Sequence, residues 1–288
     1  MITRAVCSIA LALFFPVTSL CAQGPDVAPQ RAITVPIKRD WSVREEGEFS
    51  HLTWKSGEQE FGHLKFRKDG GSPFIEAIGF SNNRDDAGTP VARALEPVFN
   101  LSVGTRQAPL GRPPEMSVWN VFFDKVHTRP YETHVSKRDA SRPTCDELAL
   151  TPVVRVPGLS LGPFQGELVI TCYLGHRLIR IEAEVSTEVD RRAIIYDAGL
   201  ATNASLWKSL AWMDTEGRLQ KQPSNEDATD THLAVRHRTI IAEGASGSLA
   251  CFPPPHQFFF PRDATDNLKY VWYGKGHGDV AMPFGFGV

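Results

Sequence analysis

Cysteine is scarce in this chain, with five among 288 residues. Two of them, Cys7 and Cys21, lie in the first 22 residues, so removal of that segment would leave Cys145, Cys172 and Cys251. At most one disulfide can then form, and the sequence leaves all three pairings open. A fold stapled by several disulfides is excluded, so the protein must be stabilised by a hydrophobic core of its own.

An excess of charge of one sign is missing as well, and so are the sequence motifs of cofactor and metal binding. The chain has 31 Lys and Arg against 33 Asp and Glu, a net charge of −2, and these residues are scattered. A nucleic-acid partner is therefore not expected, since such partners select basic patches. There is no CxxC or Cys/His ladder for zinc, no phosphate-binding glycine loop and no Gly-x-Ser-x-Gly elbow. The sequence thus predicts no metal centre and no cofactor, and it gives no support to a serine hydrolase.

Helical periodicity is almost absent. Only residues 90–99 and 204–213 have the apolar spacing of short helices. Elsewhere short apolar segments alternate with turn residues, and 21 prolines and 23 glycines are spread through these turns. The sequence predicts an all-β fold, a β-sandwich or supersandwich of antiparallel strands with one or two short helices.

Several segments have the two-residue alternation of strands. The clearest is residues 166–188, where two alternating runs flank a Leu-Gly-His turn and predict a β-hairpin. A second hairpin is predicted from residues 239–242 and 249–252 around a glycine-containing turn. Further strands are predicted at residues 47–54, 62–67 and 74–80.

The one long apolar run lies at the amino terminus. An arginine precedes the run, and Ala22 precedes polar residues, which is the pattern of a secretory signal peptide over residues 1–22. We therefore predict a secreted or periplasmic protein without membrane attachment after cleavage. A membrane anchor is disfavoured because Pro16 interrupts a run shorter than the roughly 20 residues that a span needs. A lipoprotein signal through Cys21 is disfavoured because Leu20 is not a small residue.

The mature chain is expected to be one domain. Residues 23–36 are rich in Pro and Ala and predict an arm or linker, and residues 37–288 predict a single β-sandwich domain. The proline-containing stretch 106–114 is interpreted as a loop, because the strand patterns on both sides are alike. The apolar end, residues 282–288, is either a final strand or a point where the polypeptide continues in a longer parent, and we favour the second.

The densest chemistry lies at residues 251–277, which hold seven of the 28 aromatic residues. His256 follows three prolines and precedes a Phe-rich run, so a stiff backbone would hold its imidazole in place. His256 is the candidate general acid or base, with Arg262 and Asp263 as ligand-binding neighbours. The alternative is a buried histidine satisfied by backbone groups, beside a structural Arg262–Asp263 pair.

Two further groups of residues could bind a polar ligand. Trp272 and Tyr273 precede a glycine-rich stretch and could stack on a sugar ring, although the sequence favours a solvated hairpin tip there. Residues 126–135 carry His127, Arg129, Tyr131 and His134, for which we predict ligand binding through the guanidinium and the ring. A plain polar edge strand is the alternative there, and a metal site is rejected because the spacing matches no zinc motif.

Paired carboxylates occur at Glu182 and Glu184, on one face of a predicted strand with Arg180. Such pairs can do acid and base work on glycosides. A solvated polar face is the more usual meaning of this spacing.

The 166–188 hairpin, the segment Arg-Arg-Ala-Ile-Ile-Tyr-Asp-Ala-Gly at 191–199 and the segment 252–266 together resemble the amino-terminal region of large secreted bacterial proteins. These are similar to galactose-mutarotase-like supersandwiches, β domains that accompany many polysaccharide lyases and glycoside hydrolases. The resemblance implies a parent that continues into a catalytic domain, such as a metal-dependent hydrolase. Mutarotases use a histidine acid and a glutamate base; His256 and Glu182 are candidates, but no spacing fixes them, so no catalytic role is transferred.

The function expected from the sequence is a secreted carbohydrate-binding β-sandwich module, accessory to a larger extracytoplasmic carbohydrate-active enzyme or metal-dependent hydrolase. Its partner would be a carbohydrate or another small polar ligand. Two alternatives remain: a mutarotase-like epimerase, lyase or glycosidase that uses His256, and a structural module whose aromatic segment packs against a downstream catalytic domain.

Overall fold

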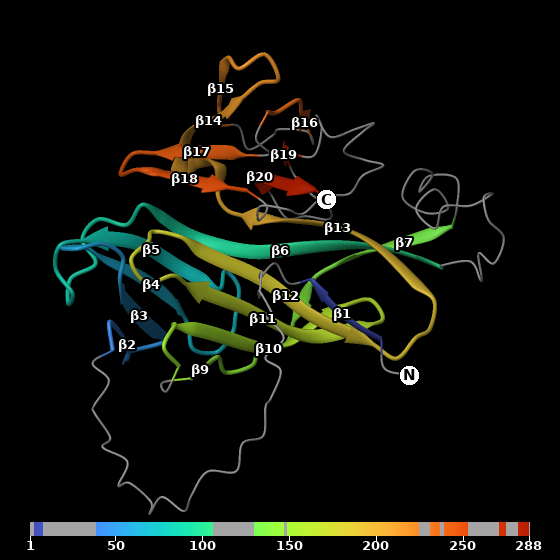
Figure 1. Ribbon diagram of the computed structural model, residues 1–288, viewed down its shortest axis with the longest axis horizontal. Helices are drawn as coiled ribbons and strands as arrows, with labels where there is room; N and C mark the ends of the chain where they lie inside the picture. The colour runs from blue at the N-terminus through green and yellow to red at the C-terminus, as the bar shows by residue number, and fades with distance from the viewer. Residues whose placement is uncertain are drawn as a thin grey trace, which may run out of the picture.

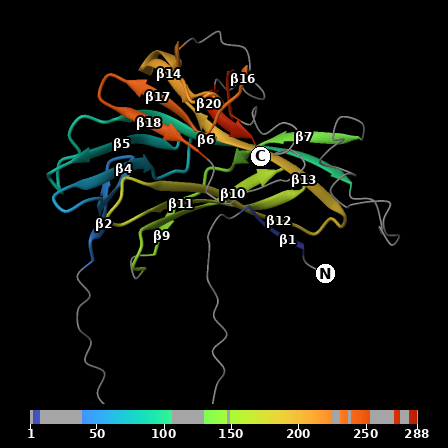
Figure 2. The ribbon, with the colours of Figure 1, turned by 45° about the horizontal axis from the view of Figure 1, so that its top comes forward.

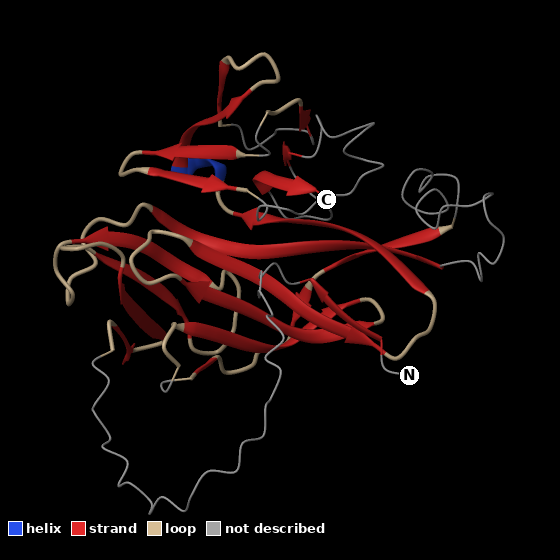
Figure 3. Cartoon of the chain, in the orientation of Figure 1, coloured by secondary structure: helices blue, strands red, loops and turns tan. Residues whose placement is uncertain are grey.

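The structure, a computed structural model, describes residues 3–7, 39–105, 130–146, 149–224, 231–236, 239–252, 271–274 and 282–287. Regular structure within these ranges is almost entirely β, in three sheets whose strand pairs are all antiparallel (Figures 1 and 3). The predicted all-β fold is confirmed.

The first sheet is built on the predicted hairpin, which is confirmed as β11 paired with β12. Its strand order is β1–β12–β11–β10–β8, and β9 also pairs with β10. The strands are β1 (Thr3–Cys7), β8 (Lys137–Arg138), β9 (Thr144–Cys145), β10 (Val153–Leu161), β11 (Phe164–Cys172) and β12 (Ile179–Thr187).

The second sheet has the order β16–β19–β20–β13–β6–β5–β4–β3–β2, with β7 also paired to β6. Strands β3, β4 and β5 confirm the three predicted near residues 47–80. The strands are β2 (Trp41–Glu46), β3 (Phe49–Lys55), β4 (Phe61–Arg67), β5 (Ile75–Ser81), β6 (Ala92–Thr105), β7 (Tyr131–Val135), β13 (Arg192–Ala201), β16 (Thr231–Leu233), β19 (Val271–Gly274) and β20 (Met282–Gly287).

The third sheet contains the second predicted hairpin, confirmed as β17 paired with β18. Its order is β15–β14–β17–β18, and a single 3-10 turn, η2 (Ala204–Leu206), precedes it. The strands are β14 (Trp207–Met213), β15 (Leu219–Pro223), β17 (Ile240–Gly244) and β18 (Ser248–Cys251).

The sheets are stacked in layers. Strands β10, β11 and β12 lie below the second sheet, while β14, β17 and β18 lie above β6 and β13 (Figures 1 and 2). The largest side chains that are almost fully buried include Trp54, Phe66 and Phe164, from the first two sheets. One continuous hydrophobic cluster contains these residues together with Leu210 and Ile240 of the third sheet. The sandwich core is therefore continuous with the packing of the third sheet.

The expectation of a helix at residues 90–99 is wrong, because Ala92–Thr105 form the long central strand β6. Strand β6 pairs with β13 on one side and with β5 and then β7 on the other, and both of its faces are largely buried. Apolar residues therefore occupy both faces, which imitates helical spacing. The helix expected at 204–213 is also wrong beyond its first turn, because η2 passes directly into β14.

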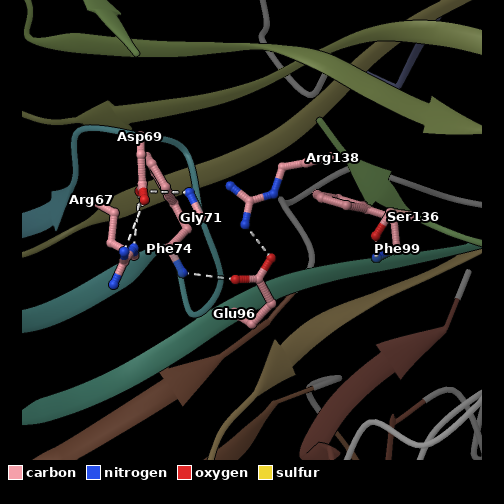
Figure 4. A network of polar contacts seen from close by, with 8 residues as sticks. All are labelled: Arg67, Asp69, Gly71, Phe74, Glu96, Phe99, Ser136 and Arg138. Atoms are coloured by element: carbon pink, nitrogen blue, oxygen red, sulfur yellow. Dashed lines mark hydrogen bonds and ion pairs between the residues drawn. The ribbon is translucent and has the colours of Figure 1, made fainter. Parts of the chain in front are cut away.

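A polar network fastens the turn between β4 and β5 to the middle of the second sheet (Figure 4). The backbone N–H of Phe74 donates to Glu96 Oε2 at 2.7 Å, and Arg138 forms an ion pair with the other oxygen of Glu96. The Arg138 guanidinium also lies 4.9 Å from the centroid of the Phe74 ring. Glu96 thus joins strands β5, β6 and β8 through one carboxylate.

The amino terminus and the cysteines bear on the remaining expectations. Strand β1 lies within the predicted signal peptide and pairs with the outer edge of β12. Residues 8–38 and 106–129, which include the predicted arm and loop, lie outside the described residues.

Cys145, Cys172 and Cys251 all carry free thiols, and burial raises the pKa of Cys172 above its usual range. In the described part of the chain, no helix has the length and apolarity to cross a membrane.

Candidate functional site

A row of polar side chains crosses five strands on the face of the second sheet that points away from the first. Strand register sets Arg44 of β2 opposite His51 of β3, and His51 opposite Lys65 of β4. The same row continues to Ala77 of β5 and Arg93 of β6. Because directly paired residues share a face, these five side chains lie side by side.

Two small residues on β5 leave a hollow in this face. Gly79 follows Ala77 on the same face and pairs with His63 of β4. A Cβ atom at Gly79 would lie 2.8 Å from the backbone oxygen of Ala87, so the loop between β5 and β6 packs directly against the strand. Long side chains surround the two small ones, and the loop forms the far wall.

We call this hollow the two-histidine pocket. It encloses about 280 Å³ and is lined by Arg44, Glu46, His51, His63, Lys65, Glu76, Ala77, Gly79, Asp85, Asp86, Ala87, Gly88, Pro90 and Arg93. The lining holds no aromatic residue other than the histidines and no long aliphatic one. Its chemistry is therefore that of a polar recognition site.

The two histidines form a buried hydrogen-bond chain. His51 and His63 are 4% and 1% exposed. Nε2 of His51 lies 3.2 Å from Nδ1 of His63, and Nε2 of His63 lies 3.1 Å from Oγ of Ser81. The hydroxyl of Thr53 is 3.5 Å from the same Nδ1. The hydrogen-bond chain therefore runs across the sheet to Ser81, the last residue of β5 before the loop.

The direction of this chain follows from Ser81. Its Oγ accepts the N–H of Asn83 and donates its single proton to the backbone oxygens of Asn83 and Asp86. Because that proton is already committed, Ser81 can only accept from His63, which must carry its proton on Nε2. Nδ1 of His63 then accepts from Nε2–H of His51. Nδ1 of His51 is left as a buried lone pair without a partner in the described part of the chain.

Both imidazoles are held in the neutral form. Burial, together with the positive charge of Arg44, lowers the pKa of His51 to about 4. The pKa of His63 is lowered as well, mainly by burial, while a hydrogen bond from its ring to the backbone of Asn83 opposes the shift. Burial penalises the charged imidazolium because it removes the solvating water. At neutral pH the pocket floor is therefore an uncharged hydrogen-bonding surface.

The charged side chains of the pocket are not paired with one another. Three cationic and four acidic side chains line it, and none of the seven forms an ion pair with any residue that the structure describes. Arg44 instead donates from Nη2 to the backbone oxygen of Asp85 at 3.3 Å. Arginines elsewhere, such as Arg155 and Arg177, pair with glutamates. The pocket thus keeps charges of both signs available to a ligand.

The structure places the predicted residues of β7 far along the sheet from this pocket. Tyr131 is 40% exposed and pairs in register with Gly104, and Nε2 of His134 lies 3.6 Å from Glu132. The His134 ring packs on Gly162, where an added Cβ would lie 2.4 Å from the ring. The structure places Tyr131 and His134 on the same short strand, β7.

Trp272 and Tyr273 lie inside the protein. Both are 3% exposed, and the Tyr273 hydroxyl donates to the side chain of Gln222. In this arrangement neither ring offers a free face for stacking on a sugar, although the ligand-binding prediction itself stays untested. The carboxylates predicted as a pair are separated by their partners: Glu182 pairs with Arg180, and Glu184 with Arg155.

The remaining predicted site residues lie outside the described residues. They are His127, Arg129, His256, Arg262 and Asp263. The catalytic role predicted for His256 therefore stays a prediction.

Sequence reasoning missed the two-histidine pocket. Its residues come from five strands and a loop, and each one alone looks like an ordinary surface residue. One signal was present: the strands predicted at 47–54 and 62–67 form a hairpin, and its register brings His51 and His63 to neighbouring positions on one face. That signal needs the register, which the turn fixes and the strand pattern does not.

Comparison with known proteins does not assign the chain, because no protein-family model and no curated protein matches it. Within the described ranges, no group of three or more His, Cys, Asp or Glu side chains is placed to hold a metal ion. The pocket geometry is therefore the observation on which a functional proposal can rest.

Proposed function

We propose that this chain is an exported β-sandwich module that binds a carbohydrate, or another small ligand rich in hydroxyl groups, in the two-histidine pocket. We further propose that it is an accessory part of a larger extracytoplasmic enzyme, carbohydrate-active or a metal-dependent hydrolase. The supporting observation is the set of seven charged side chains around the pocket, which have no ion-pair partner among the residues that the structure describes.

Hydroxyl groups match this lining because each can donate and accept a hydrogen bond at once. Guanidinium and carboxylate groups make the stronger, charge-assisted bonds to such groups. A strongly charged ligand would leave part of the lining unmatched, since three positive and four negative side chains nearly cancel. A volume of about 280 Å³ is at the small end for ligand pockets, which favours one sugar ring.

The proposal is tested by titrating neutral monosaccharides and short oligosaccharides into the chain at neutral pH, by calorimetry. Arg93→Gln should weaken binding at least tenfold, because one charge-assisted hydrogen bond contributes about 1.5–3 kcal/mol. The matched control is Arg84→Gln, in the same loop region but outside the lining, which should leave binding unchanged. Absence of binding to every sugar, or equal weakening by both variants, would reject the proposal.

The interface alternative has support of its own from β19. All four of its residues are buried, including Trp272 and Tyr273, as expected for aromatic residues that pack within the protein. The enzymatic alternative rests on His256, which the structure does not describe. The variant His256→Ala would distinguish these two alternatives when both sugar binding and sugar turnover are measured. Loss of turnover with retained binding would favour catalysis.

A further inference from the structure

The loop between β5 and β6, residues 82–91, forms one wall of the two-histidine pocket. Four of its backbone N–H groups are hydrogen bonded: Asn83 to Ser81 Oγ, Asp85 to Asn83 Oδ1, Gly88 to Asp86 Oδ1 and Val91 to the Ile78 oxygen. Two of these bonds lie within the loop, and the other two reach Ser81 and Ile78 of β5. The closed position therefore depends on a small number of anchors to the sheet.

Two anchors reach the loop from the polar row of the sheet. The first is Ser81, which gathers the loop through the oxygens of Asn83 and Asp86 and is itself bound by Nε2–H of His63. The second is Arg44, which donates to the oxygen of Asp85. His51 is connected to both anchors. It bonds to His63, which in turn bonds to Ser81, and it pairs in register with Arg44.

In the hydrogen-bond chain of the two histidines, one nitrogen can accept an added proton. Nδ1 of His51 is the only lone pair of the two imidazoles that no described group uses. The charged and titratable groups around the histidines are Arg44 and Glu46 from β2, Lys65 from β4, Glu76 from β5, Arg93 from β6, and Asp85 and Asp86 from the loop. Arg44 and Lys65 repel an imidazolium at His51, and Glu46 attracts it. Asp85 and Asp86 attract one at His63.

We propose that acidification opens the loop at residues 82–91, because a proton on Nδ1 of His51 creates a buried N–H without an acceptor and a positive charge beside Arg44. The charge displaces Arg44 from Asp85, and solvation of the imidazolium requires the loop to leave the pocket. The same movement removes the far wall of the pocket. The device is independent of which ligand the pocket holds.

The size of the effect follows from linkage. The closed state holds the pKa of His51 at about 4, whereas a solvated histidine has the ordinary value of 6.5. The open state therefore binds more protons between these values, and its population rises by up to about tenfold per pH unit as the pH falls. Across the whole window the opening equilibrium should change by about 300-fold. Above pH 6.5 the loop stays closed.

Hydrogen exchange measured by mass spectrometry tests this without any ligand. Peptides that cover residues 82–91 are compared at pH 7.0, 5.5 and 4.5, with exchange times scaled for the intrinsic chemistry. In the wild-type chain their protection should fall by at least tenfold from pH 7.0 to 4.5, while peptides from β3 and β4 stay protected. Equal protection at all three values would overturn the proposal.

Variants distinguish loop opening through His51 from a general destabilisation of the protein at low pH. His51→Gln keeps a donor toward His63 but cannot titrate, so loop protection should no longer depend on pH. The matched control is His176→Gln, at an exposed turn outside the pocket, which should behave as wild type. Should His51→Gln fail to fold, Ser81→Ala serves, with fast loop exchange expected already at pH 7.0. Retention of the wild-type pH dependence in His51→Gln would overturn the proposal.

Discussion

The Glu96–Arg138 ion pair is the most deeply buried charge pair in Figure 4. The two side chains are 18% and 7% exposed, and Glu96 also accepts the N–H of Phe74. A charge at such a position is costly to leave without its partner, since little water reaches it. The Arg155–Glu167 pair, by contrast, has side chains that are 44% and 30% exposed, and it contributes much less.

The substitution Glu96→Gln should therefore lower the free energy of unfolding by about 3 kcal/mol, because it leaves the Arg138 guanidinium unpaired. Urea unfolding at neutral pH measures the change. The control is Glu167→Gln, which removes the exposed partner of Arg155 and should cost less than about 1 kcal/mol. Similar losses in the two variants would show that burial does not set the strength of these pairs.

His51 should also make global stability depend on pH. Its folded-state pKa is depressed to about 4, so the unfolded chain binds more protons between about pH 6.5 and 4, and stability falls as the pH falls through that window. The stability advantage of the wild-type chain over His51→Gln should shrink by up to about 3 kcal/mol from pH 7 to pH 4, with the full loss for a loop that stays closed and a smaller one as the loop opens. Urea unfolding of both chains at pH 7, 5.5 and 4 measures it. A constant difference between them would contradict the depressed pKa.

At the residue scale, candidate site residues were predicted from the sequence where aromatic, histidine and charged residues cluster within a short segment. That criterion selected residues 251–277, where Trp272 and Tyr273 prove to be buried. It missed His51, whose neighbours in sequence are Ser50 and Leu52 and whose partners come from other strands. A site assembled by strand register has no local signature, because each strand contributes one or two residues to it.

Among the elements, the β3–β4 hairpin depends on a glycine that admits a tryptophan ring. Gly62 pairs with Trp54, and a Cβ atom at Gly62 would lie 2.3 Å from Cζ2 of that ring. Trp54 is fully buried, and its Nε1–H donates to the backbone oxygen of His176 at 3.0 Å. The ring therefore has no direction in which to retreat without loss of this bond.

Gly62→Ala should lower the free energy of unfolding by about 2–3 kcal/mol, as expected for an atom forced into a close-packed core. Gly57→Ala in the turn between the same two strands is the control. Its Cβ would lie 3.4 Å from Cβ of Glu60, so a change within about 0.5 kcal/mol is expected. Thermal and urea unfolding measure both variants, and a harmless Gly62→Ala would show that the ring can shift.

Elements with one buried face were predicted well from the sequence, and the element buried on both faces was not. The hairpin of β11 and β12 has clear alternation, and its position was predicted within a few residues. Strand β6 has layers on both sides, so its apolar residues lose the period of two. This strand contains Pro97, which lies where β5 has ended and β7 has not begun. The unpaired edge there tolerates a residue without an N–H group.

For the whole molecule, the continuous hydrophobic cluster predicts a single unfolding unit. Leu210 of the third sheet belongs to the same cluster as the residues between the first two sheets. The sequence-based prediction of one domain at residues 37–288 is tested by this property, since a separate third sheet would melt on its own. The stacking of three sheets could not be predicted, because strand patterns do not say which sheet a strand joins.

Calorimetry should therefore show one transition whose van't Hoff and calorimetric enthalpies agree. Leu210→Ala should lower the free energy of unfolding by about 2–5 kcal/mol and move that whole transition to lower temperature, because the side chain is 1% exposed. Leu206→Ala, at a position 42% exposed, should barely move it. Two separate peaks, of which only one responds to Leu210→Ala, would indicate two domains.

The length of β6 has a consequence for the size of any shared ligand. Arg93 at the pocket and Gly104, the register partner of Tyr131, are eleven residues apart on this strand. At about 3.3 Å per residue, that is a span of up to about 36 Å. One monosaccharide cannot touch both places. If Tyr131 and the two-histidine pocket recognise the same molecule, that molecule is a polymer of many sugar units laid along the sheet, and affinity should rise with chain length.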